Sequence, residues 1–104
     1  MQDGDKINDE TVDPDGRRIV LLQRIWIEKI LRIHPEMHAF QADVLRAVAV
    51  PDHLERDSRP GRTRSFSKCA GPTDWLLVVV SYEQQPARII TAYGYRKDPQ
   101  LWKP

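Results

Sequence analysis

The chain has 104 residues, of which 40% are hydrophobic and 30% are charged, and its formal net charge is +1. This length supports one hydrophobic core rather than two, and the composition excludes a disordered chain. The single cysteine, Cys69, excludes an internal disulfide and a cysteine-based zinc or iron–sulfur site, and favours a reducing, cytoplasmic compartment.

Charge is distributed unevenly along the chain. Residues 1–16 contain six acidic residues and one lysine, which leaves residues 17–104 with a net charge of +6. A basic folded part favours phosphate-bearing or acidic partners, but it does not choose between RNA, DNA and an acidic protein. No apolar run is long enough to span a bilayer and the acidic start is unlike a secretory signal, so we expect no membrane partner and no export.

The N-terminal residues predict a tail followed by a hairpin. Residues 1–10 are expected to form an acidic mobile tail, and residues 11–104 a single domain. The sequence Asp13-Pro14-Asp15-Gly16 is typical of a tight turn, because proline presets φ and glycine permits a positive φ. The apolar residues on either side of this turn predict a short hairpin.

Two amphipathic helices are predicted next. Apolar residues recur at helical spacing from Leu22 to Ile33. Pro35 disfavours helical geometry at His34 and can begin a second helix, which is expected to run to about Val48. His34 is therefore expected at the junction of the two helices.

The remaining sequence predicts strands separated by turn-rich segments, at residues 53–56, 62–69, 75–82 and 88–95. Residues 75–80 are apolar on both faces, which indicates a central strand. Together the patterns predict an α+β fold in which two N-terminal helices pack on a mainly antiparallel sheet of about four to five strands.

One predicted strand carries cations around an aromatic ring. Alternation places Arg62, Arg64, Phe66 and Lys68 on one face. Such a face can hold a phosphate backbone while the ring stacks on a base, as in single-strand recognition. An exposed strand whose charges prevent edge pairing would show the same pattern, so both interpretations stay open.

The other candidate residues are a histidine and two hydroxyl groups. His34 is the first choice for proton transfer, although it could simply cap the second helix, while His38 is expected to be exposed and His53 to open an edge strand. Thr91 and Tyr93 share one face of the last strand and can orient a phosphate, although both residue types also favour strands for packing alone.

The pattern of residues does not favour a metal site or a cofactor. The segment from His34 to His38 superficially resembles the zinc-protease helix motif, but Pro35 stands in place of its glutamate and interrupts the helix that the spacing needs. The acidic residues concentrate in the tail, away from any two-metal arrangement. A nuclease with this sequence is expected to work without metal.

Taken together, the pattern resembles the barnase, EndoU, colicin and RelE group of small ribonucleases, in particular its phage-borne members and, more loosely, BrnT-like toxins. The resemblance covers about residues 11–95 and consists of Asp15-Gly16, Trp26, His34-Pro35-Glu36, Ala49-Val50-Pro51-Asp52, the basic strand around Arg64, the run from Leu76 to Val80, and Ile89-Ile90-Thr91-Ala92-Tyr93. It implies a RelE/barnase-like fold and a cytoplasmic toxin that acts on RNA.

The resemblance also implies roles for residues. His34 would be the catalytic histidine, Arg64 (or Arg62) the strand cation and Thr91 the last-strand hydroxyl, with weaker roles in substrate binding for Lys68 and Tyr93. An antitoxin or immunity protein would be a partner. The alternatives are a non-catalytic module that binds RNA or protein through the basic sheet face, and a structural protein whose charges only interact with solvent.

Overall fold

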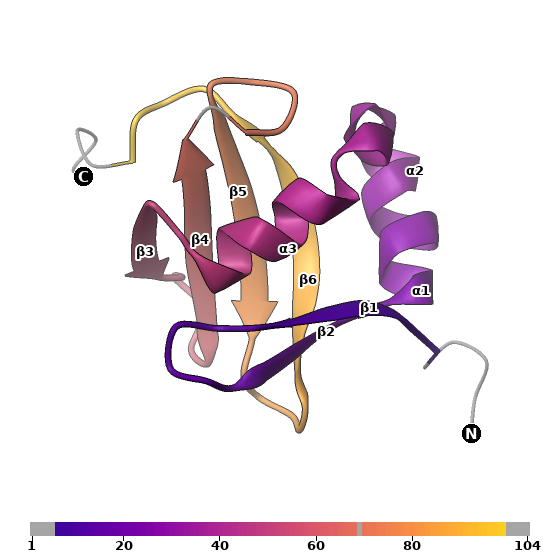
Figure 1. Ribbon diagram of the computed structural model, residues 1–104, viewed down its shortest axis with the longest axis vertical. Coiled ribbons are helices and arrows are strands. Elements are labelled where there is room, and N and C mark those ends of the chain that lie inside the picture. The colour runs from indigo at the N-terminus through magenta and orange to yellow at the C-terminus, as the bar shows by residue number, and fades with distance from the viewer. Residues whose placement is uncertain (1–5, 69, 100–104) are drawn as a thin grey trace.

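The computed structural model describes residues 6–68 and 70–99, which form a sheet with helices packed against it (Figure 1). In chain order the elements are β1 (Ile7–Val12), β2 (Arg18–Leu22), α1 (Gln23–Ile25), the π-helical η2 (Trp26–Ile30), α2 (Leu31–Ile33), the 3-10 helix η3 (Pro35–Ala39), α3 (Gln41–Ala49), β3 (His53–Arg56), β4 (Arg62–Lys68), β5 (Trp75–Ser81) and β6 (Ala87–Tyr95). The α+β class predicted from the sequence is confirmed.

The strands form one six-stranded sheet in the order β1-β2-β6-β5-β4-β3. Four of the five neighbouring pairs are antiparallel, whereas β2 and β6 run parallel through Ile19 opposite Ala87 and Val20 opposite Arg88. The sheet therefore has six strands, whereas the sequence predicted four to five.

The additional pairing lies at the N-terminus. Residues 7–10 were expected in the mobile tail, but they belong to β1 and pair with β2. Their side chains are exposed and mostly polar, so backbone hydrogen bonds to β2 hold these residues in place rather than burial of apolar surface.

Three parts of the sequence predictions lie outside the described residues. They are residues 1–5 of the predicted tail, residues 100–104 of the predicted domain and Cys69 of the predicted strand.

The first predicted helix is continuous from α1 to α2 and ends at His34, as expected. The second predicted helix is divided into η3 and α3, because Phe40 leaves helical geometry with φ −118° and ψ 22°. The α1–α2 helix lies beside β6, and α3 crosses the sheet over β4 and β5 (Figure 1). None of the helices formed by the described residues has the length and apolarity needed to cross a bilayer.

The main core lies between the helices and one face of the sheet. It contains Trp26 and Ile30 of the first helix, Val44 and Val48 of α3, and alternate residues of β5, namely Leu76, Val78 and Val80. A smaller cluster occupies the opposite face of the sheet and is formed by Phe66, Trp75, Leu77 and Val79. This second cluster contains no helical residue, so we call this side the open face.

Candidate functional site

The open face brings together residues from four strands of the sheet. Strand register places Glu55, Arg64, Val79 and Thr91 in one row across β3, β4, β5 and β6, and places His53, Phe66, Leu77 and Tyr93 in the next row. The expected side-by-side arrangement of Thr91 and Tyr93 is therefore present. Because strands lie about 4.8 Å apart, the backbones of Arg64 and Thr91 are about 10 Å apart across Val79.

His34 lies against this face at the edge of β6. Its imidazole stacks on the Tyr93 ring, with 5.1 Å between ring centroids and an angle of 24° between the planes. The Nδ1 atom lies 3.6 Å from the Glu36 Oε2 atom, and 30% of the side chain is exposed. A cleft of about 400 Å³ beside the stack is lined by His34, Glu36, Tyr93 and Arg96, among others. The histidine at the helix junction is thus directed toward a last-strand phenol and toward solvent.

Arg64 is held by carboxylates rather than left free. Its Nη2 atom contacts Glu55 Oε2, and its Nε atom lies 3.7 Å from Asp57 Oδ1. The other Glu55 oxygen lies 2.9 Å from the His53 Nε2 atom. A chain of polar contacts therefore runs from His53 through Glu55 and Arg64 to Asp57.

Sequence reasoning missed Glu55 and gave His53 no role. For Glu55 the signal was its place opposite Arg64 in the predicted pair of strands, since cross-strand neighbours in a hairpin form such ion pairs. His53 lies opposite Phe66, so its contact with Glu55 had no such signal.

Tyr93 lies between the histidine, which stacks on its ring, and the arginine, whose charge acts on its hydroxyl. Burial raises the pKa of Tyr93, the charge of Arg64 opposes that rise, and Tyr95 and Asp57 add to it. Arg64 is therefore close enough for its charge to act on the phenol on which His34 stacks. The three predicted residues His34, Arg64 and Tyr93 form one neighbourhood, and strand register adds Thr91 to it.

Two of the predicted binding residues occupy other positions. Phe66 is only 2% exposed, and its ring packs against His53 at 5.5 Å and Tyr95 at 5.4 Å between centroids. It supports the sheet from within and is not available to stack on a base. Lys68 is exposed at the end of β4 and lines a different cleft beside α3, together with Asp43 and Arg46.

Arg62 belongs to a second group of cations at the start of β4. Its Nε atom lies 3.6 Å from Glu83 Oε1. Burial lowers the pKa of Lys29, and the nearby charges of Arg62 and Arg59 lower it further. Lys29 was not singled out from the sequence, because its position on the helix shows no sign of these cations, which follow it by some 30 residues.

No group of three or more His, Cys, Asp or Glu side chains within residues 6–68 and 70–99 is arranged to hold a metal ion. Comparisons with protein-family models, with curated proteins and with solved structures each found no match for this chain.

Proposed function

We propose that the chain is a metal-independent endoribonuclease with a RelE/barnase-like fold, which cleaves RNA through attack of a 2′-hydroxyl on the adjacent phosphorus. The observation that carries the proposal is the stack of His34 on Tyr93, with the Arg64 charge acting on the same phenol. One partly exposed surface then holds a proton-transfer group, a cation and hydroxyl donors. These are the groups that this reaction needs.

The reaction forms a bond between the 2′-oxygen and phosphorus and breaks the bond between phosphorus and the 5′-oxygen. The products are a 2′,3′-cyclic phosphate and a free 5′-hydroxyl. In this mechanism His34 transfers a proton to or from the reacting oxygens, while the Tyr93 and Thr91 hydroxyls donate hydrogen bonds to the phosphate. A positioned acid or base contributes about 10²- to 10⁴-fold to the rate.

Arg64 stabilises the charge that builds on the nonbridging oxygens. A guanidinium has five N–H donors, and two of its nitrogens, Nη2 and Nε, face Glu55 and Asp57. In this proposal a remaining donor meets a phosphate oxygen. The two carboxylates hold the guanidinium in place, at the cost of offsetting part of its charge.

The fold gives independent support to this proposal. Two helical segments between β2 and β3 pack on a mainly antiparallel sheet, which is the arrangement that the resemblance implies. The six strands exceed the expected number, so the RelE/barnase-like assignment remains part of the proposal.

The decisive experiment is an RNA cleavage assay with mixed RNA and excess EDTA. We expect the wild-type protein to cleave, and His34→Ala to lower the rate by about 10²-fold or more. His38→Ala is the matched control, because His38 is exposed on η3 and contacts none of the site residues. Cleavage products that carry 2′,3′-cyclic phosphate ends support the mechanism, and equal activity of His34→Ala and the wild-type protein overturns it.

Arg64 and Tyr93 are tested in the same assay. Arg64→Ala is expected to abolish cleavage, with Arg46→Ala as control, because Arg46 lies on α3 over the opposite face of the sheet. Since Arg64→Ala also leaves Glu55 and Asp57 without their cation, Tyr93→Phe provides a milder variant. It keeps the ring on which His34 stacks and removes only the hydroxyl, so folding is preserved while the rate falls by about tenfold.

A non-catalytic binding module is the second candidate, and the ion pairs of Arg64 favour it because they reduce the charge available to a transition state. RNA binding by the wild-type protein without cleavage, under conditions in which it is folded, would select this function and reject the ribonuclease.

A further inference from the structure

A second basic site lies away from His34, at the loop that joins β3 and β4. A cleft of about 470 Å³ opens there, and we call it the arginine cleft; its lining includes Arg17, Arg56, Asp57, Arg59, Arg62 and Tyr82. Four cations and one carboxylate, Asp57, thus line the cleft, and carboxylates outside the lining lie close to Arg17 and Arg62. The cleft is more strongly basic than the His34 site.

Two of these arginines are not neutralised. Arg56 and Arg59 are exposed and make no ion pair within the described part of the chain. The Arg62 side chain is 23% exposed, but its Nε atom is buried and has no hydrogen-bond partner, because Glu83 Oε1 is 3.6 Å away and too distant to accept. A buried donor without an acceptor is unfavourable, and an anion with several oxygens can satisfy it.

The backbone that carries these arginines is fixed. Gly61 has φ +76°, and a Cβ atom there would lie 2.7 Å from Glu83 Cγ, so glycine allows the loop to approach the end of β5. The carbonyl of Gly61 accepts a hydrogen bond from the Tyr82 backbone N–H at 2.8 Å. The carbonyl of Arg62 accepts one from Asp57 at 3.0 Å. The cations therefore sit on a closed hairpin, which limits the entropy lost when they bind a ligand.

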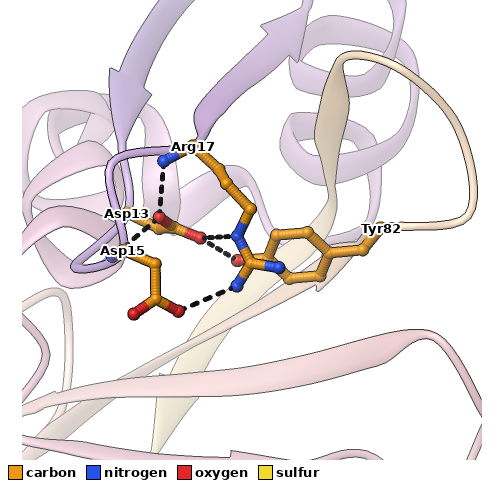
Figure 2. A network of polar contacts seen from close by, with 4 residues as sticks. All are labelled: Asp13, Asp15, Arg17 and Tyr82. Carbon is orange, nitrogen blue, oxygen red and sulfur yellow. Dashed lines mark hydrogen bonds and ion pairs between the residues drawn. The ribbon is translucent and has the colours of Figure 1, made fainter.

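Figure 2 shows how the opposite wall of the cleft is held. The Asp13 carboxylate accepts hydrogen bonds from Arg17 Nε at 2.9 Å and from the Tyr82 hydroxyl at 2.8 Å. The guanidinium carbon of Arg17 lies 4.2 Å from the centroid of the Tyr82 ring. Asp15 contacts the Nη2 atom of Arg17 at 3.1 Å. Arg17 is thus paired with two carboxylates and forms one wall of the cleft, whereas Arg56, Arg59 and Arg62 provide the charge.

Mutual repulsion within the group provides a further reason for an anion to bind. Lys29 has a lowered pKa, and the charges of Arg62 and Arg59 contribute to that shift after burial. A phosphate placed among these groups would replace repulsion with charge-assisted hydrogen bonds, and arginine binds phosphate in a bidentate manner.

We propose that the arginine cleft binds a backbone phosphate of single-stranded nucleic acid, with Arg56, Arg59 and Arg62 as its ligands. Arg62 lines the cleft and is also two residues from Arg64 on the same side of β4, so the cleft adjoins the strand cation of the proposed site. Cations that follow one another along a strand favour an extended polyanion over an isolated phosphate ion. The choice of nucleic acid rests on the proposed function, whereas phosphate binding does not depend on catalysis.

The test uses a fluorescently labelled oligodeoxythymidylate, which has phosphates but lacks the 2′-hydroxyl needed for cleavage. Its dissociation constant is measured by anisotropy over a range of salt concentrations. The affinity falls as salt rises, and for single strands each lost phosphate contact makes the slope of log K against log salt less steep by about 0.7. We expect Arg56→Ala and Arg59→Ala each to lower the affinity severalfold. In the double variant the slope should become less steep by about 0.7 or more.

Arg46→Ala is the control, since it removes one exposed arginine from α3. An equal loss in Arg46→Ala and in the cleft variants, or no binding by the wild-type protein at low salt, overturns the inference. Polyglutamate that competes better than the oligonucleotide would indicate an acidic protein ligand and also overturns it. Because the oligonucleotide cannot be cleaved, binding of it that depends on Arg56 and Arg59 without any RNA cleavage would reject only the ribonuclease. RNA cleavage with unchanged binding in the cleft variants would reject only the cleft.

Discussion

Two adjoining groups of charges are organised in opposite ways. In the turn between β1 and β2, the side chain of Asp13 is 3% exposed and both carboxylate oxygens accept hydrogen bonds, including two from backbone N–H groups. In the arginine cleft, Arg56 and Arg59 have no ion-pair partner among the described residues and the Nε of Arg62 has no acceptor. The first group stabilises the fold, and the second retains unused capacity to bind a ligand.

The pKa shifts of Asp13 and Tyr82 agree with a stabilising role for the contacts of this turn. Burial opposes ionisation of Asp13, but hydrogen bonds from the Arg17 backbone and the Tyr82 hydroxyl and the charge of Arg17 outweigh it, so the pKa of Asp13 lies below its usual value. Burial, followed by the hydrogen bond to Asp13, raises the pKa of Tyr82 to about 12. Both groups therefore favour the folded state near neutral pH.

The largest effect is expected from Asp13→Ala, which removes the acceptor for four hydrogen bonds. We expect a loss of about 2–3 kcal/mol in the free energy of unfolding at neutral pH. Because the folded pKa of Asp13 is below its unfolded value, this stabilisation is present above about pH 4 and is lost as the pH falls through the folded pKa. Urea unfolding at neutral and acid pH should show the difference between variant and wild type shrinking in acid.

Asp15→Ala is the matched control for Asp13→Ala, because the Asp15 side chain is 77% exposed and contacts only the Nη2 atom of Arg17. Its effect should stay within about 0.5 kcal/mol. Equal losses in the two variants would contradict the structural role assigned to Asp13.

A smaller effect is expected from Tyr82→Phe, which keeps the ring beneath Arg17 and removes one hydrogen bond to Asp13. We expect a loss of about 1 kcal/mol at neutral pH. Since the folded pKa of about 12 exceeds the ordinary value of 10, the stabilisation by Tyr82 is complete below pH 10 and is lost as the pH rises toward 12. Denaturation midpoints between these pH values should fall more steeply for the wild type than for the variant. Tyr95→Phe serves as the control, and parallel curves for the wild type and Tyr82→Phe would refute the assignment.

The smallest effect on stability is expected from Arg59→Ala in the arginine cleft. The exposed side chain makes no ion pair among the described residues, so the free energy of unfolding should change by no more than about 0.5 kcal/mol. The pKa of Lys29 should move upward, because one of the two arginines that lower it is removed. Nuclear magnetic resonance titration of the Lys29 side chain measures this shift, with Arg46→Ala as the control. An unchanged Lys29 pKa would show that the cations do not act as one group.

Much of the fold was predictable from local pattern. Period-two alternation located β4, β5 and β6 to within one or two residues, and Pro35 correctly predicted the end of the first helix at His34. The predictions of secondary structure were wrong where backbone pairing or local geometry outweighed the hydrophobic pattern of the sequence. Residues 7–10 have no apolar alternation but pair with β2, and Phe40 interrupts the second predicted helix.

The candidate site was less predictable, because its contacts join residues far apart in sequence. The alternation that placed Phe66 beside three cations did not show that Tyr95 and His53 would cover its ring. The sequence identified Asp13 only as a turn residue, because Tyr82, with which it forms a hydrogen bond, is 69 positions away. The proximity of Lys29 to Arg62 likewise depends on how the first helix lies beside the sheet.

The position of β6 has a consequence for how the molecule is assembled. This strand lies between β2 and β5, so it alone joins the N-terminal hairpin to the β3–β5 meander within the sheet. During synthesis β2 emerges early, but its parallel neighbour is the last of the described strands to leave the ribosome. The sheet can therefore close only after residues 87–95 are available, and a chain interrupted before them would hold two separate fragments of sheet with exposed edges.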